Sequence, residues 1–322
     1  MFIISPELLS ASMVAVRDCM GARPGEKVLV VTDASLRLIG YALHKAATDL
    51  GLDVLLVDMP PRTSNGEEPP PEVADLMARA DVVLCPTSKS LTHTDARRAA
   101  SGAGARVATL PGVTEVMMVR CMNADYHAIA ARTHRLCERL EGTSVVRVKA
   151  PAGTDITMPI AGRRAHASSG LFRERGQWGN LPTGEAYLAP IEGQSNGVVV
   201  VDGSMAGVGI VKTPIRIEVR DGYATDISGG AEARTLADLI APHGQDARTL
   251  AEFGVGTNDK AILTGLILED EKVLGTIHIA FGDNKSMGGS VRVASHLDGL
   301  IRWPTVWLDD EKIMEDGTLL VV

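Results

Sequence analysis

Two histidines and an aspartate in the second half of the chain have the types and spacing of metal ligands. His296 and Asp298 stand two residues apart, so on a β-strand both side chains project from the same face while Leu297 points into the core. Residues 276–281 alternate in the same way. On a strand, His278 lies on one face with the small residues Thr276 and Ala280, and the Ile and Phe side chains lie on the other face. Imidazole and carboxylate on one face form half of a metal site. The alternative is that His296 and Asp298 only pair with each other.

Two glutamates could complete such a site. Glu185 lies in a turn that leads into an apolar strand, and Glu252 follows a predicted helical stretch at residues 246–251. Either residue alone is typical of a solvated glutamate at an element boundary. Their combination with the histidines suggests a shared metal centre.

Other catalytic arrangements are missing from the sequence. It contains no GxSxG turn, no HExxH helix and no cysteine beside a histidine in a known motif. The first predicted strand is followed by residues 33–40, which lack the glycines that let a backbone close on a pyrophosphate. We therefore expect the first half to be a scaffold or one wall of a cleft, and not a nucleotide binder.

The first half alternates short β-branched runs with helical patterns. Such alternation predicts a parallel sheet with flanking helices. The expected strands, each buried on both faces, are residues 27–32, 53–58, 80–85 and 105–110, and the expected helices include residues 36–50 and 125–140. A proline-rich stretch at residues 59–71 is expected to be a surface loop.

After residue 140 the sequence changes to strands, frequent glycines and hairpin-like breaks. We therefore predict an α/β scaffold domain at residues 1–140 and a β-rich α+β catalytic domain at residues 141–322 that carries the metal site. Helices are expected in the second domain near residues 231–239 and 246–251.

Composition limits the functional classes. The net charge of −8 argues against a basic surface that binds phosphates, and the aromatic content of 3% argues against a surface on which bases stack. We therefore expect no nucleic-acid partner. Residues 1–9 carry no Lys or Arg ahead of an apolar stretch, and no 18 apolar residues run together, so we expect a cytoplasmic protein without a membrane partner. The four cysteines lack CxxC spacing and are expected to be reduced core residues.

Four segments of the second half, in consistent order, resemble the signatures of the aminopeptidase T and aminopeptidase S metallopeptidases. The segments are residues 180–185, 251–258, 271–282 and 295–298, and the similarity extends over about residues 141–317. The resemblance implies a homodimeric hydrolase with about two divalent ions, zinc or cobalt, that cuts the N-terminal residue from small peptides or a related amide.

Carried over residue by residue, the ligands of those peptidases fall on five positions. They are Glu185, Glu252, His278, His296 and Asp298. Two metals would share a water and lower its pKa, while Glu185 or Glu252 takes the proton. Which of the two glutamates is the base and which is a bridge stays open at this point.

The chain also resembles the 2,5-dihydroxypyridine dioxygenases, which hold one non-haem iron with two histidines and an aspartate. His296 and Asp298 fit that ligand set, whereas its remaining histidine aligns with Glu252. Residues 90–93 are similar to a loop of those enzymes that carries a histidine directed towards the substrate. The resemblance makes His93 a candidate acid–base residue. The alternative is that Thr92 caps a helix and His93 faces solvent. A catalytically silent metal-binding homologue is the third reading.

Overall fold

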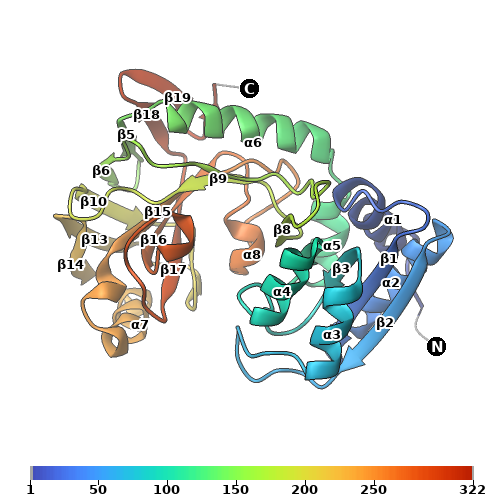
Figure 1. The fold of residues 1–322 in the computed structure, drawn as a ribbon. Coiled ribbons are helices and arrows are strands. Elements are labelled where there is room, and N and C mark those ends of the chain that lie inside the picture. The colour runs from blue at the N-terminus through green and yellow to red at the C-terminus, as the bar shows by residue number, and fades with distance from the viewer. Residues whose placement is uncertain (1–2, 321–322) are drawn as a thin grey trace. The chain divides into compact units, whose positions relative to one another are not determined.

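The computed structural model describes residues 3–320, which form two compact units (Figure 1). Unit 1 contains the chain up to Ala128 together with Gly170–Thr183, and unit 2 contains Ile129–Ser169 and the chain from Gly184 onward. The prediction of one boundary after residue 140 differs from this division. The chain leaves unit 1 within a helix and later returns to it with a strand, and hydrophobic periodicity gives no signal for such a return.

Unit 1 contains a five-stranded parallel sheet in the order β2-β1-β3-β4-β8, as the alternating pattern predicts. Its strands are β1 (Lys27–Asp33), β2 (Asp53–Met59), β3 (Val82–Cys85), β4 (Arg106–Thr109) and β8 (Trp178–Asn180). The expectation that all strands are buried on both faces is wrong for β2, because it lies at the sheet edge and is partly exposed. Strand β8 was not predicted.

Helices flank this sheet. They are α1 (Pro6–Met13), continued by a π-helix at Val14–Cys19, then α2 (Arg37–Asp49), α3 (Pro71–Arg79), α4 (Asp95–Ala103) and α5 (Glu115–Met122). Alternate strand residues such as Leu29, Val83 and Val107 form one core with apolar residues of α3 and α4. The proline-rich stretch between β2 and α3 is a loop, as predicted.

Unit 2 contains two sheets of antiparallel strands. The eight-stranded sheet has the order β14-β13-β10-β6-β5-β18-β19-β20, and the seven-stranded sheet has the order β12-β11-β17-β16-β15-β9-β7. The first comprises β5 (Val145–Lys149), β6 (Asp155–Pro159), β10 (Asn196–Val201), β13 (Ile215–Arg220), β14 (Tyr223–Ser228), β18 (Thr305–Leu308), β19 (Glu311–Glu315) and β20 (Thr318–Leu319). The second comprises β7 (His166–Ser168), β9 (Glu185–Leu188), β11 (Ser204–Met205), β12 (Gly209–Ile210), β15 (Leu250–Gly256), β16 (Thr276–Gly282) and β17 (His296–Arg302).

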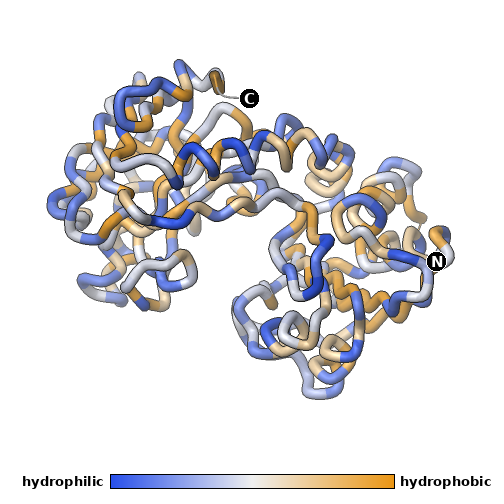
Figure 2. Tube along the Cα trace, turned by 45° about the horizontal axis from the view of Figure 1, so that its top comes forward, coloured by the Kyte–Doolittle hydropathy of each residue, from blue (hydrophilic) through white to orange (hydrophobic). Residues whose placement is uncertain are grey.

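One apolar core joins the two sheets of unit 2. It contains inward residues of both sheets together with residues of α6 (Tyr126–Glu141), in which the chain passes from unit 1 to unit 2, and of α7 (Ala231–Ile240). A short helix, α8 (Ile267–Asp270), and three 3-10 turns at Ala241–His243, Asp246–Arg248 and Lys285–Met287 complete the unit. Figure 2 colours the chain by hydropathy and shows apolar and polar stretches alternating along it.

The four cysteines are buried and unbridged, as predicted. Burial raises the pKa of the Cys85 thiol to about 12, which suits an inert packing residue. Within residues 3–320, no helix is both long enough and apolar enough to cross a bilayer.

Candidate metal centre

The predicted ligands lie on four neighbouring strands of the seven-stranded sheet, β17, β16, β15 and β9, which are labelled in Figure 1. Ala280 pairs with both Glu252 and Asp298, and Gly254 pairs with His278. Paired residues and residues two apart share a sheet face, so these side chains project together. The opposite face carries residues of the apolar core. The alternation predicted around His278 is therefore confirmed.

The local structure around Glu252 differs from the prediction. The expected helix at residues 246–251 is only a 3-10 turn at Asp246–Arg248, and Glu252 lies inside β15. Antiparallel pairing with β16 overrides the helical preference of the preceding residues. The buried carboxylate of Glu252 points one oxygen at His278 Nε2 and the other at His296 Nε2, each at 3.1 Å.

Glu252, His296 and Asp298 form what we call the Glu252 cluster, whose ligand atoms all lie within 4.8 Å of one another. His296 Nδ1 lies 2.7 Å from the Asp283 carbonyl, which can only accept, so Nδ1 carries the proton. The other nitrogen, Nε2, then faces Glu252 at 3.1 Å and Asp298 at 3.5 Å. A backbone carbonyl that fixes the tautomer in this way is typical of a metal-ligating histidine.

Glu185, Glu271 and His278 form a second group, the Glu185 cluster, which also meets the 4.8 Å criterion. Within it Glu185 Oε2 and His278 Nδ1 are buried without a hydrogen-bond partner. Lys272 Nζ lies 2.6 Å from Glu185 Oε1 and also contacts Glu271. The sequence analysis missed the roles of Glu271 and Lys272, because a charged pair before an apolar strand is normally solvated.

Mutual contacts set the protonation behaviour of the histidines and carboxylates in the two clusters. Burial lowers the pKa of His296, but Asp298 and Glu252 outweigh it and hold the pKa well above its usual range. Burial likewise opposes protonation of His278, yet Glu252 and Glu185 raise its pKa to about 9. For Glu252 the hydrogen bonds from both imidazoles overcome burial and lower its pKa. The carboxylates that favour the protonated imidazoles also favour a divalent cation, which must displace a proton to bind an imidazole.

The carboxylates around Lys272 act on its pKa in the same way. Burial alone lowers that pKa, but Glu185 and Glu271 outweigh burial and raise it. Burial raises the pKa of the Glu271 carboxyl to about 8, with Lys272 opposing the shift. Lys272 therefore remains an ammonium at neutral pH.

A glycine makes room for the His278 imidazole. A Cβ atom on Gly254 would lie 2.0 Å from His278 Nε2, so no larger residue fits opposite the histidine on β15. The Glu-Phe-Gly pattern at residues 252–254 thus has a steric reason.

The loop between β16 and β17 is held by Glu192. This carboxylate accepts hydrogen bonds from Asn284 Nδ2 at 2.9 Å and Ser290 N at 2.7 Å, and it contacts Arg163. Burial works against ionisation, but these donors prevail and lower the Glu192 pKa to about 2. The same loop contains Asp283, whose carbonyl orients His296.

An aromatic pair lies on the ligand face of the sheet. Tyr187 pairs with Gly254 across the strands, and its ring stacks on His166 with centroids 5.3 Å apart. Burial, followed by the carboxylates of Glu185 and Glu252, raises the Tyr187 pKa. The phenol therefore stays neutral.

His93 belongs to unit 1, where it is exposed and its ring meets Trp178 edge-on at 6.4 Å. The alternative interpretation of this loop had Thr92 as a helix cap; in the structure Thr94 caps α4, and Thr92 bonds Thr109 at 2.7 Å. Arg97 donates to the Thr92 carbonyl at 2.7 Å and stacks on Trp178. These contacts order the loop that carries His93.

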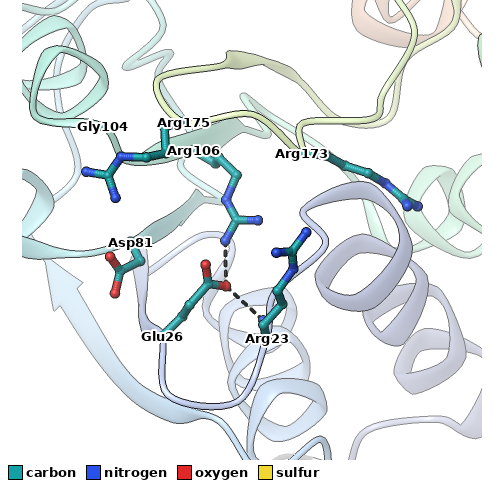
Figure 3. Close-up of a pocket in the computed structure, with 7 residues that line it drawn as sticks. All are labelled: Arg23, Glu26, Asp81, Gly104, Arg106, Arg173 and Arg175. Atoms are coloured by element: carbon teal, nitrogen blue, oxygen red, sulfur yellow. Dashed lines mark hydrogen bonds and ion pairs between the residues drawn. The ribbon is translucent and has the colours of Figure 1, made fainter.

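A separate hollow of about 230 Å³ lies in unit 1 (Figure 3). It is lined by Arg23, Glu26, Asp81, Gly104, Arg106, Arg173 and Arg175. Glu26 is bound by Arg106 Nη2 at 2.6 Å, and Lys27 N donates to Asp81 at 2.9 Å. Four guanidinium groups disfavour a metal cation there, so the hollow is no alternative metal centre.

The structure thus brings together all five residues expected as metal ligands, and adds Glu271 to them. Imidazole nitrogens and carboxylate oxygens suit a divalent ion such as iron, manganese, cobalt or zinc. In the Glu252 cluster, the buried carboxylate of Glu252 and the backbone carbonyl that fixes the tautomer of His296 also fit a site for a cation.

Comparisons with known sequences agree on one family. The family described as NicX, 2,5-dihydroxypyridine 5,6-dioxygenase, matches residues 9–321 of the chain. The 2,5-dihydroxypyridine 5,6-dioxygenase of Pseudomonas putida KT2440 is 26% identical over 193 residues, which cover 54% of this chain and 54% of that protein. The match therefore spans about half the length of the curated relative.

Two solved structures share the fold. The 2,5-dihydroxypyridine dioxygenase of Pseudomonas putida KT2440 superposes with a TM-score of 0.86 at 20% identity, covering 99% of both chains. AmpT from Thermus thermophilus superposes with a TM-score of 0.71 at 19% identity, covering 98% of this chain and 99% of that one. The resemblance to the aminopeptidases is therefore supported at the level of the fold.

These comparisons overturn the predicted activity. The family match, the curated relative and one of the two structures all name a dioxygenase, so the expectation of a zinc-dependent aminopeptidase hydrolase acting on peptides or amides is wrong. The five ligand-type side chains lie together, but ligand type alone does not separate hydrolysis from oxygen chemistry. The expected homodimer stays a prediction.

Proposed function

The chain belongs to the 2,5-dihydroxypyridine 5,6-dioxygenase family, and on that premise we propose that it is a metal-dependent ring-cleaving dioxygenase. The proposed substrates are dihydroxylated pyridines or similarly hydroxylated aromatic rings, with dioxygen as co-substrate. The observation that carries the proposal is the Glu252 cluster, which gathers one imidazole and two carboxylates on one sheet face.

The ligand set departs from the two histidines and one aspartate that the resemblance implies. Glu252 takes the place of a histidine, so the proposed set is Glu252, His296 and Asp298. Imidazole and carboxylate ligands accept iron(II) among other divalent ions, and three protein ligands leave positions open for further ligands. When bound, such an ion supplies Lewis acidity and one-electron chemistry towards dioxygen.

Residues of the chain would hold the ion, contact the substrate ring and transfer a proton. Glu252 and Asp298 supply negative charge that holds the cation, and the Asp283 carbonyl fixes the tautomer of His296. The Tyr187 ring offers an apolar face with a neutral hydroxyl, which suits packing against a flat ring. We assign proton transfer to His93 on the likeness of residues 90–93 to the dioxygenase loop.

An oxygen electrode tests the proposal. Metal-free protein is loaded anaerobically with iron(II) and mixed with 2,5-dihydroxypyridine, and related dihydroxylated rings are tested in parallel. We expect oxygen uptake that requires the metal, stops with a chelator and matches the amount of ring opened. Protein that retains iron but consumes no oxygen with any of these rings would contradict the assignment.

A further inference from the structure

Lys272 is buried at the centre of the Glu185 cluster. Its residue is 2% exposed, and its Nζ atom lies 2.6 Å from Glu185 Oε1 and in contact with Glu271. Its backbone is also fixed, since Lys272 N donates to Glu269 O and Lys272 O accepts from Asn258 N, each at 2.9 Å. The ammonium is therefore directed into the cluster by the fold, in the turn between α8 and β16.

An ammonium at this position and a metal ion compete for the same oxygens. Carboxylate oxygens bind a divalent ion at about 2.0–2.2 Å, a position that the hydrogen-bonded Nζ already blocks. Two cations within one buried cluster also repel each other strongly, because the interior screens charge poorly. Conversely, without Lys272 the buried carboxylate of Glu185 would lose its ammonium partner.

The Glu252 cluster lacks such a resident cation. Among residues 3–320, the ion pairs of Glu252 and Asp298 are formed with His278 and His296, and none is formed with a lysine or arginine. An ion from solution therefore competes there with the displaceable proton on His296 Nε2, and not with a lysine ammonium. The two clusters are therefore unequal although their ligand types match.

We propose that Lys272 is a built-in cation that takes the place of a second metal in the Glu185 cluster. The chain then holds a single ion, in the Glu252 cluster, instead of the two expected from the peptidase resemblance. This inference rests on the proposed function only in placing the catalytic ion at Glu252. Lys272 acts as a positioning residue, because its charge fixes the carboxylates of Glu185 and Glu271.

The test counts tightly bound metal. Wild type and Lys272→Met are loaded with excess iron(II) or manganese(II), desalted and measured by elemental analysis. We expect about one ion per chain in wild type and about two in Lys272→Met, because removal of the ammonium frees a second site with one imidazole and two carboxylates. Lys272→Arg keeps the charge and should stay at about one.

A matched control is Lys312→Met, which removes a lysine that is paired with Glu315 on the surface of unit 2. It should leave the number of bound ions per chain unchanged.

A second ion in wild type overturns the proposal, and so does a folded Lys272→Met that gains none. If Lys272→Met does not fold, Lys272→Gln takes its place, because it keeps hydrogen-bond donors towards Glu185 and Glu271 without the charge, and a folded Lys272→Gln that gains no second ion also overturns the proposal. Oxygen uptake is a separate readout: one ion without oxygen consumption contradicts the dioxygenase function and leaves the role of Lys272 intact.

Discussion

The two clusters on the seven-stranded sheet contain the same ligand types, one imidazole and two carboxylates each, yet their surroundings differ. The side chain of His296 in the Glu252 cluster is 31% exposed and its Nδ1 is bound by a carbonyl. His278 in the Glu185 cluster is fully buried, its Nδ1 has no partner, and Lys272 fills the space between the carboxylates. Neighbouring charge and access therefore decide which cluster can take a metal, and ligand type alone does not.

The largest expected effect comes from removing the histidine of each cluster in turn. His296→Ala should lose the metal and lower oxygen uptake by on the order of 10³-fold or more, since the ion then has only two protein ligands. His278→Ala should keep its metal, because His278 is not part of the proposed ligand set, although its Nε2 lies 3.1 Å from Glu252. Elemental analysis and an oxygen electrode check both variants. Loss of metal in His278→Ala to the same extent would remove the distinction between the clusters.

His93→Ala tests whether unit 1 contributes chemistry while unit 2 holds the metal. Removal of a general acid–base group costs about 10²–10⁴-fold in turnover, so kcat should fall by that range while metal content stays constant. His134→Ala changes an exposed histidine on α6 and should be silent. Unchanged kcat in His93→Ala would show that His93 is only a loop residue.

Acidity should weaken metal binding at the Glu252 cluster. The pKa of His296 is raised, so its Nε2 holds a proton more strongly than an ordinary imidazole, and the metal must displace that proton. Below this raised pKa, affinity should fall by up to about tenfold for each pH unit of acidification. Chelator competition between pH 6 and pH 8 measures the slope. A flat profile would mean that no proton leaves His296 on binding.

The smallest expected effect concerns the loop that supports only the Glu252 cluster. Glu192→Gln weakens the contacts of this side chain with Asn284, Ser290 and Arg163. These contacts hold the loop that contains Asp283. Loss of such outer support typically costs about 10–100-fold in metal affinity, and we expect the lower end because the Asp283 carbonyl itself remains. Titration with iron(II) or manganese(II) measures the change, and an unaltered affinity would show that the loop orients His296 without Glu192.

The sequence predicted those parts of the site that depend on local periodicity. His278, His296 and Asp298 project together because a strand alternates faces with period two. Glu252 was assigned to a helix end because the preceding residues favour helix, whereas pairing with β16 makes a strand. Burial of Lys272 depends on Glu185, which is distant in the chain, so no local pattern could indicate it.

The division into units shows the same limit. The parallel sheet and its helices follow from alternating apolar runs in the first half. Strand β8 joins this sheet beside β4 although it comes from residues 178–180, within the part predicted as the β-rich domain. A three-residue strand has too few alternations to be recognised from sequence.

Labelling with ¹⁸O₂ tests the central claim most directly, because a dioxygenase transfers both oxygen atoms to its product. Iron(II)-loaded protein is supplied with ¹⁸O₂ and 2,5-dihydroxypyridine, and the ring-opened product is analysed by mass spectrometry. We predict that the product carries both labelled atoms in wild type, and that no such product forms with His296→Ala. A product labelled only from water, or none at all from the metal-loaded wild type, would contradict the account.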